Sequence, residues 1–170
     1  MTMKIDGFAR TPAFMAAVAL SAISATPAAA KHAFSHYPVT KALEGAPVHP
    51  DYRGAAATYR TKIRQAVQAG PNAAGHYAII PIGCGGSCTV VQMVDLRDGT
   101  LLAFPVGGED YYGLAIDFDL TSRLIIADWK DTSGGSFNVC VRRYYQIADR
   151  AFTLLNETRR TVDEEEGCAG

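Results

Sequence analysis

Four cysteines carry the most distinctive chemistry in this sequence. Cys84 and Cys88 stand at the two ends of the segment Cys-Gly-Gly-Ser-Cys, and Cys140 and Cys168 follow later in the chain. An even number of cysteines is typical of a disulfide framework in an exported protein, and four cysteines allow three pairings. We favour Cys84 with Cys88, because they flank one tight turn, and Cys140 with Cys168, because that bond would fasten the C-terminal tail.

The loop between Cys84 and Cys88 has a competing interpretation as a redox or nucleophilic centre. A reactive thiolate usually belongs to a Cys-x-x-Cys motif at a helix N-terminus, where backbone N–H groups stabilise the anion. Here the spacing is Cys-x-x-x-Cys between two predicted strands, so we predict a structural disulfide. The N–H groups of this loop could still hold an anion. The predicted binding residues are Gly85, Gly86, Ser87 and the neighbouring His76.

His76 and Asp95 are the most plausible acid–base pair in the chain. His76 opens the first predicted strand and Asp95 closes the second, with Ser87 in the loop between these strands. A histidine that is paired with an aspartate and placed next to a serine is the arrangement of an acyl-transfer centre. No Gly-x-Ser-x-Gly elbow surrounds Ser87. We therefore favour the other interpretation, in which the ring of His76 bonds a backbone carbonyl at the end of a strand.

Asp117 and Asp119 form a second candidate pair, close to Arg123 across a predicted turn. Alternate residues of a strand share one face, about 7 Å apart, so two carboxylates at these positions are compatible with glycoside hydrolysis. The commoner role is an ion pair with Arg123 that stabilises the hairpin. We keep the carboxylate pair only as part of an alternative, hydrolytic hypothesis.

Neither the histidines nor the overall charge predicts a metal, a cofactor or a nucleic-acid partner. His32, His36 and His49 lie near the predicted mature N-terminus, but no acidic or thiolate side chain is placed to complete a metal site. The formal net charge is −1, from 16 basic and 17 acidic residues. Such a balance produces no field that would concentrate nucleic acid. We expect no metal and no cofactor.

Residues 1–30 have the pattern of a secretory signal peptide. Basic residues precede an apolar stretch from Ala13 to Ile23, and Ala28 and Ala30 occupy the small-residue positions of a cleavage site. The apolar stretch is too short for a membrane span, which needs about 20 residues. We expect a soluble mature chain that begins near Lys31, without a membrane span, in the periplasm or outside the cell.

The mature chain divides into three parts by composition. An extended leader at 31–50 contains three prolines, a single globular domain is expected at 51–157, and a charged tail at 158–170 ends near Cys168. Within the domain, helical spacing of apolar residues predicts a helix over 55–69, with Asp51 as its N-cap.

After the helix, the pattern changes to short apolar or alternating runs separated by turn residues. Predicted strands cover 76–82, 89–95, 101–106, 114–119, 122–129, 137–147 and 152–157. The gaps between them are too short for crossover helices. We therefore predict an α+β fold of mainly antiparallel β structure, in which an N-terminal helix packs on a disulfide-stapled meander of about seven strands.

Several of these motifs, in this order, resemble those of a family of small exported bacterial proteins of unknown function. That family has a Pro-Asn-Phe-Ala-Gly-His-Tyr segment, then Trp-Gly-Cys-Gly-x-x-Cys, an Asp-x-x-x-Gly hairpin and a Ser-Arg-Leu-Leu strand. The matching residues here are Pro71-Asn72, Gly75-His76-Tyr77, Gly83-Cys84-Gly85, Cys88, Asp95, Gly99 and Ser122-Arg123-Leu124-Ile125. Ala73 and Ile82 replace the two aromatic residues. The resemblance implies the fold and export, and it implies no activity.

A binding function agrees best with these patterns. No catalytic constellation is complete, and a small rigid sheet with several aromatic residues is suited to a contact face, although those residues could equally form the core. The aromatic residues are Tyr111, Tyr112, Trp129, Tyr144 and Tyr145. We expect an exported binding or interaction domain of the envelope, such as an inhibitor, whose partner is a protein or a cell-wall ligand. The alternative is a small hydrolase that uses His76 with Asp95, or Asp117 with Asp119.

Overall fold

A short helix and seven strands form the part of the chain that the computed structural model describes, residues 32–169. The predicted signal peptide lies outside the described residues. Two 3₁₀ turns, Phe34–His36 and Gly54–Ala57, precede the helix. The elements in chain order are α1 (Arg60–Ala69), β1 (Tyr77–Gly85), β2 (Cys88–Asp95), β3 (Thr100–Ala103), β4 (Tyr112–Phe118), β5 (Leu124–Lys130), β6 (Val139–Ala148) and β7 (Ala151–Thr161). No helix in this described part is long and apolar enough to cross a membrane.

The strands are antiparallel, as predicted, but they form two sheets instead of the predicted meander of about seven strands. One sheet has the order β1-β2-β3 and the other has the order β4-β5-β6-β7. The chain leaves the first sheet after Ala103 and crosses to the second through Gly107 and Gly108, which both have positive φ angles. Val106, expected in a strand, is buried in this crossing. The meander prediction was wrong because the sequence pattern locates strands but not the point where pairing changes sheet.

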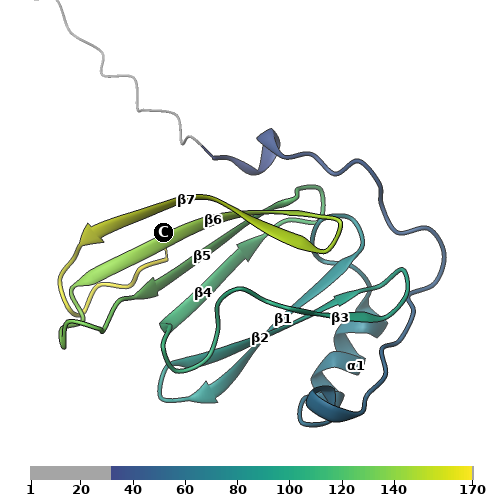
Figure 1. The fold of residues 1–170 in the computed structure, drawn as a ribbon, viewed down its shortest axis with the longest axis horizontal. Helices are drawn as coiled ribbons and strands as arrows, with labels where there is room; N and C mark the ends of the chain where they lie inside the picture. The colour runs from purple at the N-terminus through teal and green to yellow at the C-terminus, as the bar shows by residue number, and fades with distance from the viewer. Residues whose placement is uncertain (1–31, 170) are drawn as a thin grey trace, which may run out of the picture.

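The main core lies between the two sheets, which face one another in Figure 1. Tyr77, Ile79 and Met93 from the first sheet pack in the same cluster as Ile125 and Tyr145 from the second. Each sheet therefore buries the apolar side of its alternating pattern against the other. Trp129 also belongs to this cluster and is 5% exposed, so it is a core residue and not part of a contact face.

The helix α1 covers the opposite face of the three-stranded sheet (Figure 1). Ile63 and Val67 of the helix pack with Ala78, Ile80 and Val94 of β1 and β2. These two strands are consequently buried on both faces. Burial on both faces explains why residues 77–82 read as a continuous apolar run instead of an alternating one.

The helix is shorter at its N-terminus than the sequence pattern predicted. It begins at Arg60 instead of Ala55, because Gly54 has a φ angle of +59° and residues 54–57 form a 3₁₀ turn. Asp51 does not cap the helix; its carboxylate accepts hydrogen bonds from the backbone and side chain of Arg53. The predicted C-terminal limit of the helix at residue 69 is confirmed, since the helix ends at Ala69 and is followed by Gly70 with a φ angle of +90°.

Both predicted disulfides are present, Cys84 with Cys88 and Cys140 with Cys168. The second bond joins β6 to the tail and packs with the buried side chain of Val162. Disulfides are typical of proteins that fold in an oxidising compartment.

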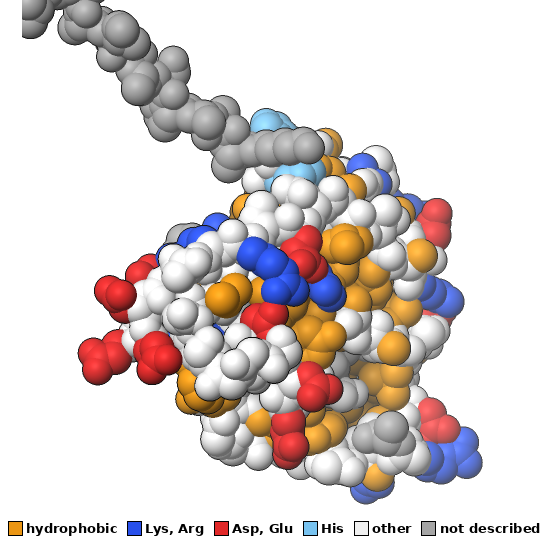
Figure 2. Space-filling model, turned by 60° about the vertical axis from the view of Figure 1, so that its left-hand side comes forward, with side chains coloured by type: hydrophobic (Ala, Val, Ile, Leu, Met, Phe, Trp, Pro, Cys, Tyr) orange, Lys and Arg blue, Asp and Glu red, His pale blue; other side chains and the backbone are white. Residues whose placement is uncertain are grey.

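On the face shown in Figure 2, basic and acidic side chains are interspersed. Exposed ion pairs of this kind contribute little to stability.

The segment before the helix, residues 37–50, runs across one end of both sheets, and we call it the strap (Figure 1). Its backbone N–H groups donate to three separate places in the domain. The hydrogen bonds join Val39 to Thr121 at 2.9 Å, Leu43 to Gly75 at 2.8 Å, and Val48 to Leu96 at 2.8 Å. The strap therefore holds the β4–β5 turn, the start of β1 and the β2–β3 turn in fixed relative positions.

Gly99 provides a test of how closely the strap is packed. Its φ angle is +75°, and a Cβ atom added there would lie 2.5 Å from the carbonyl oxygen of His49 in the strap. We expect Gly99→Ala to lower the free energy of unfolding by about 2–3 kcal/mol. Gly135 has the same φ angle of +75° with no atom within 4 Å of the added Cβ. Gly135→Ala is therefore the matched control.

Urea unfolding of the two variants gives the comparison. Gly135→Ala adds only the strain of a left-handed alanine, about 1–2 kcal/mol, so the difference between the variants reports the contact with the strap. Equal losses of stability would mean that the strap does not pack on Gly99.

Candidate functional site

The residues that precede β1 form a tight corner that positions His76. The side-chain amide of Asn72 donates to the Ile79 carbonyl and accepts from the Ile79 N–H, both at 2.8 Å. Gly75 has a φ angle of +78°, and its N–H donates to Leu120 O at 2.7 Å. The side chain of Asn72 thus makes the same pair of hydrogen bonds to Ile79 of β1 that the backbone of a neighbouring strand would make. The hydrogen bond from Gly75 to Leu120 fixes the corner against the β4–β5 turn.

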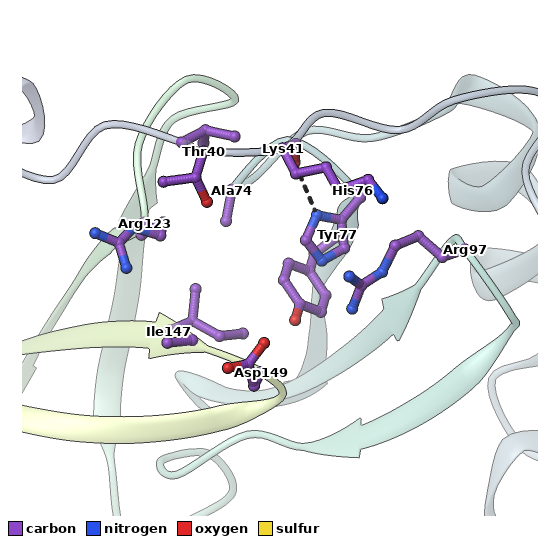
Figure 3. A pocket seen from close by; sticks show the side chains of 11 residues that line it. Thr40, Lys41, Ala74, His76, Tyr77, Arg97, Arg123, Ile147 and Asp149 are labelled. Carbon is purple, nitrogen blue, oxygen red and sulfur yellow. Dashed lines mark hydrogen bonds between the residues drawn. The ribbon is translucent and has the colours of Figure 1, made fainter.

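A cavity of about 260 Å³ lies at this corner beneath the strap, and we call it the strap cleft (Figure 3). Side chains from the strap, from both sheets and from the turns that connect their strands meet there. The lining residues are Val39, Thr40, Lys41, Ala74, His76, Tyr77, Arg97, Arg123, Ile147, Ala148 and Asp149. Among the predicted site residues, only His76 lies in this lining.

His76 is held against the strap. Its Nδ1 atom lies 3.4 Å from the carbonyl oxygen of Lys41. Because a carbonyl oxygen only accepts hydrogen bonds, the proton of the neutral ring lies on Nδ1. The Nε2 atom is buried and has no hydrogen-bond partner among the described residues. The predicted contact between a strand-end histidine and a backbone carbonyl is therefore present.

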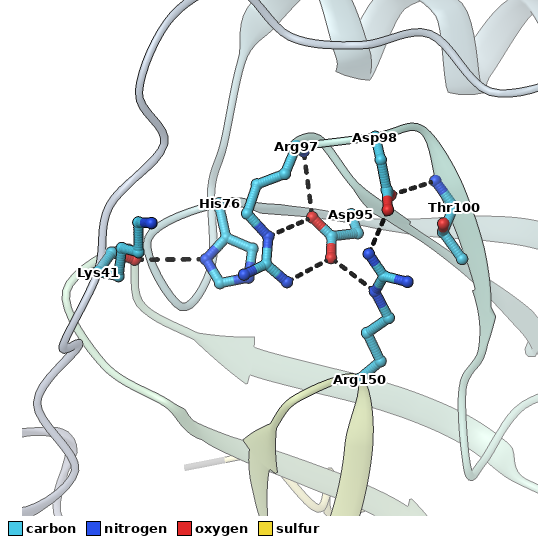
Figure 4. Close-up of polar contacts among 7 residues, drawn as sticks. All are labelled: Lys41, His76, Asp95, Arg97, Asp98, Thr100 and Arg150. Carbon is cyan, nitrogen blue, oxygen red and sulfur yellow. Dashed lines mark hydrogen bonds and ion pairs between the residues drawn. The ribbon is translucent and has the colours of Figure 1, made fainter.

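His76 does not form a dyad with Asp95, because arginines occupy the Asp95 carboxylate (Figure 4). Arg97 donates from Nε at 2.9 Å and from Nη2 at 2.6 Å, and Arg150 donates from Nε at 2.9 Å. Arg150 also pairs with Asp98. The Asp95 side chain is completely buried. Because Asp95 accepts hydrogen bonds from Arg97 of the β2–β3 turn and from Arg150 of the β6–β7 turn, its role is structural: it connects these two turns.

Opposing effects set the pKa of Asp95. Burial on its own raises this pKa, but the hydrogen bonds from Arg97 and Arg150 outweigh burial and lower the pKa to about 2. For His76, burial and the positive charge of Arg97 both lower the pKa below 6.5. At neutral pH the cleft therefore presents an uncharged imidazole beside an ionised, arginine-bound aspartate.

We expect His76 to make the protein less stable as the pH falls below about 6.5. Folding lowers the pKa of His76, so the unfolded chain binds the proton more readily than the folded one. The neutral imidazole therefore favours the folded state fully above pH 6.5, and this contribution is lost as the pH falls toward the lower pKa of the folded protein. Thermal unfolding of the wild type and His76→Gln between pH 7.5 and 5 checks this expectation. Glutamine can still donate to Lys41 O, and the other histidines remain in both proteins. The variant should show the smaller loss of melting temperature, and an equal loss would exclude His76 as the source.

The predicted serine and glycine candidates lie at the other end of the first hairpin. Tyr77 pairs with Asp95 at one end of the β1–β2 ladder, and Gly85 pairs with Cys88 at the other. β1 alone has nine residues, about 30 Å of extended chain. Ser87 and the glycine loop therefore cannot contact His76 or Asp95. The carbonyl of Ser87 instead accepts from Gly113 N at 2.9 Å, which ties the loop to β4.

The Asp117 and Asp119 pair is not assembled either. β4 ends at Phe118, so Asp119 belongs to the following turn, where its carboxylate accepts from the N–H and hydroxyl of Thr121 at 2.6 and 2.5 Å. These hydrogen bonds lower the pKa of Asp119. Asp117 lies opposite Ile126 on the face of the sheet that points away from the core. Arg123 pairs with neither aspartate among the described residues and donates from Nε to Pro38 O at 3.1 Å.

The cleft contains residues that the sequence did not indicate as site residues, chiefly Arg97 and Asp149, and Arg123, which was considered only as an ion-pair partner of Asp117 or Asp119. Asp149 lies between the predicted strands at 137–147 and 152–157, and its φ angle of +47° is typical of a turn residue. No group of three or more histidine, cysteine, aspartate or glutamate residues among 32–169 is arranged to hold a metal ion. No family model, curated protein or solved structure matches this chain. The assignment of function therefore depends on the geometry of the cleft.

Proposed function

We propose that this chain is an exported binding domain of the bacterial envelope that acts without catalysis. The observation that supports this proposal is the strap cleft, a cavity of about 260 Å³ that is lined by charged and polar side chains from separate parts of the fold. Ligand sites are typically concave and combine apolar walls with a few convergent polar groups. The partner of this domain is another envelope protein or a cell-wall ligand. If the partner is an envelope enzyme, this domain acts as the inhibitor of that enzyme.

The hydrolase hypothesis has less support, because three of its four acid or base candidates have a structural partner, and the fourth, Asp117, lies on the face of the second sheet that points away from the core. Asp95 is bound by two arginines, Asp119 by Thr121, and the protonated nitrogen of His76 by a strap carbonyl. A general base must reach the proton that it removes and must have a pKa near the working pH. The pKa of Asp95, about 2, is too low for that role.

Turnover measurements test the proposal. The oxidised chain is incubated at pH 7 with chromogenic esters and chromogenic glycosides, in parallel with His76→Gln and Asp117→Asn. We expect no turnover above the buffer rate for any of the three proteins. Turnover by the wild type that either substitution abolishes would overturn the proposal in favour of a hydrolase.

A further inference from the structure

The charges that line the strap cleft differ in whether another side chain neutralises them. Arg97 is paired with Asp95 at 2.6 Å, so its charge is already compensated. Arg123 has no carboxylate partner among the described residues; its Nε donates to Pro38 O at 3.1 Å and its backbone N–H donates to Tyr37 O at 2.7 Å, both in the strap. Asp149 makes no hydrogen bond and no ion pair within the described chain. Among the described residues, the charged side chains of the lining without an ion-pair partner are thus the guanidinium of Arg123, the ammonium of Lys41 and the carboxylate of Asp149.

Arg123 and Asp149 come from different strands and turns and meet at the same cavity. Arg123 follows the β4–β5 turn, and Asp149 lies in the β6–β7 turn. In Figure 3 the side chain of Ile147 lies between them, and the ring of His76 lies on the far side. Ile147 is 1% exposed. The two charged groups are therefore separated by an apolar surface, in a cavity that is small compared with a drug-sized site.

We propose that the strap cleft binds a small zwitterion of amino-acid size, with the ligand carboxylate on Arg123 and the ligand ammonium on Asp149; this inference rests on the proposed binding function. A guanidinium presents paired N–H donors that match the two oxygens of a carboxylate. Within residues 32–169 the side chain of Arg123 donates only through Nε, to Pro38 O, so its Nη groups are available for this contact. A ligand with a carboxylate alone would leave Asp149 unpaired, and an amine alone would leave Arg123 unpaired.

Substitutions at the two charged positions can be chosen so that the fold is kept. Asp149→Asn removes the charge while asparagine tolerates the φ angle of +47°. Arg123→Lys keeps a positive charge but loses the paired donors. Asp110→Asn is the matched control for charge, because Asp110 is exposed and makes no hydrogen bond or ion pair within the described residues. The melting temperature of each variant shows whether it is folded.

Isothermal titration calorimetry at pH 7 tests the proposal with three probes: alanine as the zwitterion, propionate as the carboxylate alone and ethylamine as the ammonium alone. We expect alanine to bind the wild type at least about tenfold more tightly than either singly charged probe. Asp149→Asn and Arg123→Lys should each weaken alanine binding by about tenfold or more, and Asp110→Asn should leave it unchanged.

Three results would overturn the inference. They are equal binding of propionate and alanine, alanine binding that neither cleft substitution weakens, and no alanine binding by the folded wild type. Each of these results leaves the non-catalytic function standing, because turnover assays test that function separately. The comparison of alanine with propionate and ethylamine uses the wild type alone, so it does not depend on whether any variant folds.

Discussion

Replacing Asp95 by alanine is expected to lower the free energy of unfolding by about 3–5 kcal/mol. The substitution leaves two guanidinium groups, of Arg97 and Arg150, facing one another without the buried carboxylate that they share. It also removes the connection between the β2–β3 turn and the β6–β7 turn. Urea unfolding at pH 7 measures the effect.

The matched control for this prediction is Asp98→Ala. Asp98 is bound by the same Arg150, but its side chain is 45% exposed, whereas that of Asp95 is completely buried. Exposed ion pairs contribute about 1 kcal/mol or less. Similar losses for the two variants would show that the buried carboxylate is not the joint between the turns.

Asp95 also gives the protein a defined response to acid. Its pKa is 3.8 before folding and about 2 in the folded protein. A lowered folded pKa means that the stabilising effect is complete above 3.8 and is lost as the pH falls toward about 2. We expect a loss of about 1–2 kcal/mol, reduced by screening because both arginines are partly exposed. Asp95→Asn should lose less stability than the wild type over this pH range.

Removal of the Cys140–Cys168 disulfide has the second large expected effect. The bond joins cysteines 28 positions apart, and the loop-entropy model assigns about 3.5 kcal/mol to a ring of that size. The double substitution of Cys140 and Cys168 by serine should therefore lower the free energy of unfolding by about 3–4 kcal/mol. The tail beyond β7 should then become sensitive to proteases.

The Cys84–Cys88 bond is the internal control for the disulfide prediction. Its cysteines are only 4 positions apart, which corresponds to about 2 kcal/mol in the same model. Guanidinium unfolding of both serine double variants compares the two losses. A greater loss from the short ring than from the long one would contradict the structural account of the tail.

Local features of the fold were predictable because local patterns determine them. The pairing of Cys84 with Cys88 follows from their position around a turn, and both disulfides were predicted correctly. The strands start and end within a few residues of the predicted positions, because apolar runs and turn residues are properties of short segments. The N-terminal limit of the helix was wrong, since the positive φ angle of Gly54 cannot be read from spacing alone.

The candidate site was not predictable, because it depends on contacts between distant parts of the chain. Arg150 binds Asp95 across 55 positions, and Lys41 contacts His76 across 35. Hydrophobic periodicity gives no information on which turn approaches which strand end. His76, which the sequence singled out, lines the strap cleft, but its predicted companion Ser87 lies at the opposite end of the hairpin.

Chemical-shift mapping of the wild type with alanine tests the central claim most directly. Backbone amide spectra of the isotope-labelled chain are recorded during a titration with alanine at pH 7. We expect concentration-dependent shifts at Ala74, His76, Arg123 and Asp149, which line the strap cleft, and no shifts in the loop at 85–87. Shifts that centre on the 85–87 loop, or no shifts at the strap cleft, would contradict the account.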